Sequence, residues 1–117
     1  MPEARFEAVT RHEGAVAIID LVGDVNGFAE AGLESAYARA VSTDPTTILL
    51  NFEKAGYINS TGIAVIVGLL AQARMSRRKV LVCGLSDHYR EIFTITRLAD
   101  FMTIYPDEAA AVASAPA

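Results

Sequence analysis

Apolar and β-forming residues along the chain gather into short runs that predict β-strands. The runs Phe6–Arg11 and Ala15–Leu21 are separated by His12–Gly14, which favours a tight turn, so we predict a hairpin there. The runs Thr46–Phe52 and Lys79–Cys83 are nearly continuously apolar, which is typical of strands buried on both faces. The pattern therefore predicts an opening hairpin followed by two central strands.

Longer stretches with helical spacing or helix-start signals lie between and after these strands. The predicted helices cover Phe28–Val41, Ile63–Ser76, Asp87–Leu98 and a last segment that starts at Pro106. The second stretch contains many β-branched residues, but it is too long for an ordinary strand and follows good N-cap residues. Gly23–Gly27 is predicted to be a loop, Met102–Tyr105 a short edge strand, and about 113–117 a frayed alanine-rich tail.

The alternation of strands and helices predicts an α/β fold, and the hairpin makes its central sheet mixed rather than purely parallel. A chain of 117 residues, 52% of them apolar, can bury one compact core, so residues 1–117 are expected to form a single domain. No uninterrupted apolar run reaches the roughly eighteen residues of a membrane span, and the first residues are polar. We therefore expect a cytoplasmic protein that has no membrane contact.

Charge and residue types narrow the classes of function. The net charge of −4 argues against a sequence-independent hold on nucleic acid, and the basic residues of Arg74–Lys79 are interpreted as a solvated helix end. Cys83, His12 and His88 lack metal-ligand spacing, so we expect neither a metal nor a cofactor. No histidine or G-x-S-x-G motif accompanies Ser60, so an enzyme is not expected. The sequence favours a protein that acts by binding.

The segment Asn59-Ser60-Thr61-Gly62, directly before the second predicted helix, is the candidate functional motif. From residue types alone, Ser60 is interpreted as a helix N-cap. A phosphate on Ser60 would be tolerated there, because free backbone amides and the helix dipole favour an anion. It would add about −1.5 to −2 charges, which would repel a partner that places carboxylates or an apolar surface against it.

Four segments of the chain together carry a family resemblance. Tyr57–Val65 resembles the phosphorylation loop of the STAS family, in which D-S-S/T-G precedes an apolar helix. Leu21–Val25 resembles the family's strand-ending G-E-L/I element, and Val82–Ser86 resembles its V-x-G-L-S element. Ile104–Ala110 resembles the closing segment before the last helix. The resemblance runs in the family's order from about Phe6 to Val112.

The resemblance implies a mixed sheet with helices mainly on one face and Ser60 as the phosphorylation site. The small bacterial members that the chain resembles are anti-sigma factor antagonists, which bind a GHKL-type anti-sigma factor serine kinase and so release a sigma factor. Phosphorylation by that kinase ends the interaction, and a metal-dependent serine/threonine phosphatase restores it. A phosphorylation-independent STAS scaffold and a small-ligand-sensing module in another signalling pathway stay open as alternatives.

The residues expected to contact a partner surround this loop, namely Asp24, Asn26, Asn59, Ser60, Thr61, Gly62, Val65 and Leu69. Asn26 and Asn59 stand where the family often has an acid, and they keep the capping ability of Asp without its charge. An apolar helix stripe is expected to face the core, formed by Ile63, Ile66, Val67 and Leu70. Val65 and Leu69 fall outside it, either in a wide buried face or in an exposed strip for a partner.

Overall fold

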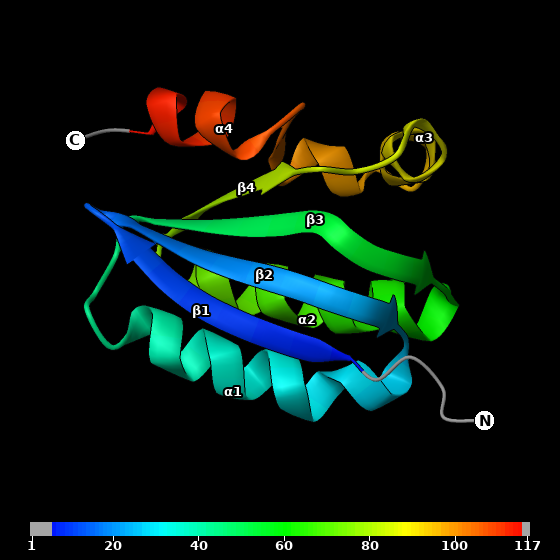
Figure 1. Ribbon diagram of the computed structural model, residues 1–117, viewed down its shortest axis with the longest axis horizontal. Coiled ribbons are helices and arrows are strands. Elements are labelled where there is room, and N and C mark those ends of the chain that lie inside the picture. Colours follow the sequence, from blue (N-terminus) through cyan, green and yellow to red (C-terminus); the bar gives the residue numbers. More distant parts are fainter. Residues whose placement is uncertain (1–5, 116–117) are drawn as a thin grey trace.

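The computed structural model describes residues 6–115 and shows strands and helices alternating along the chain (Figure 1). The elements are β1 (Glu7–Glu13), β2 (Val16–Val25), α1 (Glu30–Val41), β3 (Thr47–Ile58), α2 (Ser60–Met75), β4 (Lys79–Cys83), α3 (Asp87–Ile95), β5 (Thr103–Tyr105) and α4 (Glu108–Ser114). Two short 3-10 turns, η1 (Gly27–Ala29) and η2 (Leu98–Asp100), precede α1 and follow α3.

The five strands of the described chain form one sheet in the order β1-β2-β3-β4-β5. β1 is antiparallel to β2, and the remaining neighbours are parallel. Gly14 makes the β1–β2 turn with a φ of +60°, a backbone conformation that glycine adopts without a Cβ penalty. The predicted α/β fold with a mixed sheet is therefore confirmed.

The two faces of the sheet are covered unequally. α1 and α2 lie against one face and α4 against the other, as Figure 1 shows. Because side chains alternate along a strand, Ile48 and Leu50 of β3 join the larger core with α1 and α2, whereas Leu49 packs toward Ala111 of α4. Phe93 of α3 also belongs to the larger core, so three of the four α-helices of residues 6–115 serve one face, as predicted.

β2 and β3 are longer than predicted and extend the sheet toward α2. β2 continues to Val25 and β3 to Ile58, so most of the predicted loop Gly23–Gly27 is strand. Their pairing persists through two register shifts, between Asp20 and Val22 and between Gly23 and Val25. Such bulges break the alternation of apolar and polar residues, which is why the sequence pattern does not predict these strand ends.

The helices also differ from the prediction in which residues they bury. Phe28, the first residue of the predicted helix Phe28–Val41, lies in η1 and is 95% exposed. In α2, Ile66 and Leu70 are buried and Ile63 is half-buried, but Val67 is 44% exposed and does not belong to the core stripe. The cause is that α2 is apolar on nearly every side, so packing against the sheet and α1 selects the buried face.

The end of the chain is more ordered than expected over the part that the structure describes. α4 starts at Glu108, two residues after Pro106, with Asp107 as its N-cap. It continues through Ser114, so residues 113 and 114 of the predicted frayed tail are helical. The rest of that tail, apart from Ala115, lies outside the described residues.

Candidate functional site

The extended ends of β2 and β3 bring the β2–α1 loop and the β3–α2 junction together at the start of α2. Asn59 is the N-cap of this helix, and its side-chain oxygen accepts a hydrogen bond from the Gly62 amide at 2.9 Å. The Asn59 amide donates to the carbonyl oxygen of Val25 at 3.2 Å, which joins the start of α2 to the end of β2. The interpretation of Ser60 as the N-cap is therefore wrong, because Asn59 provides the cap and Ser60 is the first helical residue.

Ser60 and Thr61 have different environments although they are adjacent. The Thr61 hydroxyl donates to the side-chain oxygen of Asn59 at 2.7 Å and accepts from the Gly27 amide at 2.8 Å. Ser60 is exposed, and its hydroxyl makes no hydrogen bond within residues 6–115. Thr61 thus ties the β2–α1 loop to α2, while the hydroxyl of Ser60 is free to meet another molecule.

Gly62 allows the backbone of α2 to lie directly on the end of β2. A Cβ at this position would overlap the carbonyl oxygen of Val25 and lie 2.5 Å from its carbonyl carbon and 3.1 Å from the Asn26 amide nitrogen. Real Cβ atoms do not approach backbone so closely, so only glycine fits here without movement. Gly62 therefore sets the position of Ser60 relative to the loop.

Asp24 and Asn26, both expected to contact a partner, also hold the loop in shape. The Asp24 carboxylate accepts from the Tyr57 amide at 3.0 Å, and a Cβ at Gly56 would collide with the same carboxylate. The Asn26 side-chain oxygen accepts from the Phe28 amide at 2.9 Å. These bonds place both side chains in the same loop cluster as Ser60 and leave them partly exposed.

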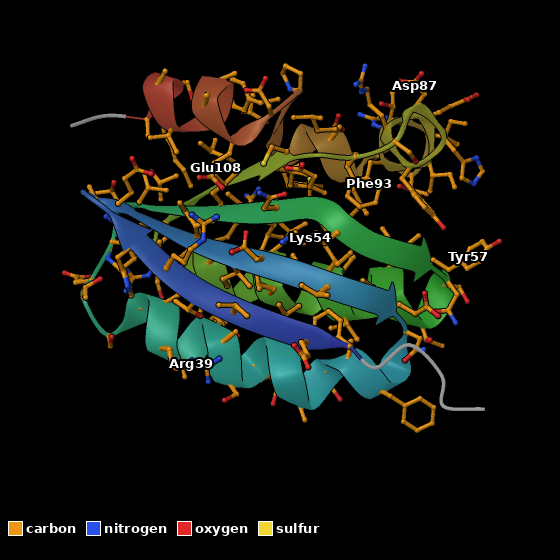
Figure 2. The ribbon with its side chains drawn as sticks, viewed as in Figure 1. Arg39, Lys54, Tyr57, Asp87, Phe93 and Glu108 are labelled. Atoms are coloured by element: carbon orange, nitrogen blue, oxygen red, sulfur yellow. The ribbon has the colours of Figure 1, made fainter. Side chains whose placement is uncertain are left out.

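Two aromatic side chains that the sequence analysis did not select stand out of this loop cluster. Phe28 is 95% and Tyr57 80% exposed, and both are fixed through their backbone amides by Asn26 and Asp24. Figure 2 shows Tyr57 projecting from the end of β3, away from the sheet. Large exposed aromatic residues are common anchors in protein interfaces. The signal available in the sequence is that each of them directly follows a glycine.

Val65 and Leu69 do not form an exposed strip. Leu69 is 4% exposed and belongs to the main core, and Val65 is half-buried beside it. The alternative of a wide buried helix face is therefore confirmed for Leu69, which is too enclosed to serve as a free contact. Val65 keeps part of its surface accessible one turn beyond Thr61.

The groups with shifted pKa values lie away from Ser60. The Arg11 guanidinium bonds Asp20 and Glu108, both at 2.6 Å, which raises the pKa of Arg11 and lowers the pKa of Glu108. This network joins β1, β2 and the start of α4. Burial raises the pKa of the Cys83 thiol to about 11, which fits its expected place in the core. These shifts follow from hydrogen bonding, ion pairing and burial.

Residues 6–115 contain no group of three His, Cys, Asp or Glu side chains arranged to hold a metal ion. Among the helices of the same range, none is long and apolar enough to cross a membrane.

Comparison with known proteins gives the family. The family model of the STAS domain matches residues 7–111. A relative from Bordetella bronchiseptica, BtrV, bears the name of an anti-sigma factor antagonist and is 30% identical over 86 residues, 74% of this chain and 72% of BtrV. The anti-sigma-B factor antagonist of Staphylococcus aureus is 27% identical over 82 residues, 70% of this chain and 76% of that protein.

Solved structures show the same fold. An anti-sigma factor antagonist from Mycobacterium paratuberculosis superimposes with a TM-score of 0.79 at 14% identity, covering 94% of this chain and 93% of the other. The phosphorylated form of the Bacillus cell fate determinant SpoIIAA superimposes with a TM-score of 0.69 at 20% identity, covering 95% of this chain and 100% of SpoIIAA. The family match over residues 7–111 and these relatives show that the chain belongs to the STAS-domain family, among the anti-sigma factor antagonists.

Proposed function

We propose that this protein is a switch that binds a GHKL-type anti-sigma factor kinase, releases a sigma factor and is inactivated by phosphorylation of Ser60. A metal-dependent serine/threonine phosphatase then restores the active form. In this proposal the protein acts in the cytoplasm, through binding and without catalytic turnover of its own.

One observation carries the proposal: the hydroxyl of Ser60 is exposed and free, whereas that of Thr61 is bonded on both sides. A kinase can reach Ser60 without disturbing the fold, but modification of Thr61 would break its bonds to Asn59 and Gly27. One fold neighbour, the Bacillus protein SpoIIAA, has a solved structure in its phosphorylated form, which supports the same chemistry here.

The position of Ser60 also explains how a phosphate would switch binding off. Ser60 is the first residue of a 16-residue helix, where free amides and the helix dipole favour an anion, so the fold is expected to survive phosphorylation. The exposed rings of Phe28 and Tyr57 belong to the same loop cluster. A partner that covers these rings would have to desolvate a phosphate of about −1.5 to −2 charges.

The test begins with incubation of the protein with the anti-sigma kinase and ATP, followed by phosphopeptide mapping. Phosphate is expected on Ser60. Ser60→Ala should bind the kinase at all times and keep its stability, because Asn59 provides the helix cap. Ser60→Asp should bind more weakly, although one carboxylate only partly replaces a phosphate.

Ser76→Asp is the matched control, because it adds the same charge after the far end of α2, about 24 Å away along the helix. It should bind as the wild type does. Phosphate on another residue, or equal binding by the Ala and Asp variants of Ser60, would remove Ser60 from this role. Equal binding would instead support the phosphorylation-independent scaffold.

A further inference from the structure

A groove runs between α1 and α2 on the surface next to the Ser60 loop. Its volume is about 100 Å³, and it is lined by four residues of α1 and five of α2. The half-buried Val65 gives it an apolar wall, and the nearly buried Leu33 and Leu69 lie at its floor. At Gly68 a Cβ would find no atom within 4 Å, so the groove is open there.

The size of the groove suits one side chain of another protein. Small-molecule sites usually enclose about 300–1,000 Å³, several times more than this groove offers. A single long side chain needs much less space. The groove is therefore better matched to a residue presented by a protein than to a free cofactor or metabolite.

The charge of the groove selects a cation. Glu30 and Glu34 lie one helical turn apart on α1, both line the groove, and neither forms an ion pair within residues 6–115. Glu30 is in the first turn of α1, where the helix dipole favours an acid, but Glu34 is beyond it and faces a like charge at i−4. A lysine or arginine would relieve this repulsion while its aliphatic stem covers the apolar wall.

Tyr37 gives a second sign that the groove lacks a polar partner. Its side chain lines the groove and is only 6% exposed, yet its hydroxyl has no hydrogen-bond partner within residues 6–115. Buried hydroxyl groups in proteins are nearly always bonded. Because the hydroxyl oxygen is itself buried, a guanidinium or ammonium group could donate a hydrogen bond to it only after the Tyr37 side chain turns toward the groove.

The groove continues the surface around Ser60. Ala64, which lines it, is one helical turn after Ser60, and Gln72 at its other end is about 18 Å from Ser60 along α2. A protein that covers Ser60 can therefore reach the groove with a neighbouring side chain. We infer that the α1–α2 groove receives a lysine or arginine side chain of the anti-sigma partner, an inference that rests on the proposed function.

The test measures the affinity of the purified anti-sigma kinase for groove variants of the full chain. Gly68→Leu fills the groove and should weaken binding about tenfold or more, as loss of an interface anchor does. Glu30→Gln and Glu34→Gln should each weaken binding and make it less dependent on salt. In double-mutant cycles, alanine at one partner lysine or arginine should couple with both Gln variants.

Two matched controls separate this effect from general damage. Ala71→Leu adds a similar side chain at an exposed position of α2 that does not line the groove, and Glu91→Gln removes an exposed charge from α3. Both should bind like the wild type. Thermal unfolding of every variant shows that the fold is retained, and sedimentation of the chain alone detects self-association.

The outcomes distinguish the inference from the proposed function. If Ser60→Asp weakens binding but the groove variants bind normally, the inference is overturned and the proposed function stands. If the groove variants instead abolish dimerisation of this chain, or the binding of a small molecule detected by native mass spectrometry, the groove holds a different occupant and the inference is overturned. If no anti-sigma kinase binds the wild-type chain, both proposals fail.

Discussion

Gly62 and Gly68 allow a paired test of how α2 is positioned, because the same substitution should have opposite effects at two sites of one helix. At Gly68 the added methyl group meets nothing within 4 Å. Ala is the better helix former, so Gly68→Ala should stabilise the protein by about 0.5–1 kcal/mol. At Gly62 the same gain is opposed by overlap with the carbonyl group of Val25.

The magnitude at Gly62 follows from what must move. The obstacle is backbone of β2 rather than the end of a flexible side chain, so either α2 or the strand has to shift. Overpacking of this kind costs about 1–3 kcal/mol, occasionally more. A shift also strains the bonds that Asn59 and Thr61 make with the β2–α1 loop. After the helix-propensity gain of about 0.5–1 kcal/mol is subtracted, the expected net effect of Gly62→Ala is a loss of up to about 2.5 kcal/mol.

Urea unfolding of the two variants beside the wild type measures these effects. With equal m-values, the transition midpoint should fall for Gly62→Ala and rise for Gly68→Ala. The two variants should then differ by about 1–3 kcal/mol, the overpacking cost, because the helix-propensity gain is common to both. If both substitutions stabilise the protein to the same degree, α2 does not rest on Val25 as described and the reasoning is refuted.

Three further predictions concern the core, the ion pair and the thiol. Leu69 is 4% exposed, so Leu69→Ala should lower the free energy of unfolding by about 2–5 kcal/mol, whereas Val67 is 44% exposed and Val67→Ala should lower it by less than about 1 kcal/mol. If urea unfolding ranks the two losses in reverse, the described burial of Leu69 is contradicted. Hydrogen bonding from Arg11 lowers the pKa of Glu108 from 4.5, so the stability that the pair provides is fully present above pH 4.5 and is lost as the pH falls through the lowered pKa. Stability measured against pH should therefore show Glu108→Gln differing from the wild type near neutrality and converging with it in acid, whereas a constant difference would exclude this linkage. Cys83, whose pKa burial raises to about 11, should react with a thiol reagent only on unfolding, and rapid labelling of the native protein would show that it is accessible.

The sequence predicts the sheet well because strand composition and turn residues are local signals. The runs that become β3 and β4 are apolar enough to demand burial on both faces, and glycine marks the hairpin turn. The ends of β2 and β3 could not be predicted, because their pairing continues across bulges through residues such as Lys54 and Gly56 that do not favour strands.

The candidate site is predicted as a location but not in its atomic roles. Residue types place Ser60 at a helix start, yet three adjacent residues can all act as caps. Only the structure shows that Asn59 is the cap and that Thr61 bonds Gly27, 34 residues away. The exposure of Phe28 is missed for a similar reason, since its apolar character fits helix periodicity while the turn η1 keeps it outside the core.

The order of strands in the sheet has a consequence for how the chain is assembled during translation. Each strand of the described chain lies beside the one made just before it, so the sheet can grow from β1 in the order in which the ribosome releases it. One bond of the first strand does not follow this order. Arg11 of β1 donates a hydrogen bond to the carboxylate of Glu108 in α4, which lies 97 residues further along the chain. A nascent chain can therefore build its whole sheet, but it fastens the first strand to α4 only after the last helix has emerged.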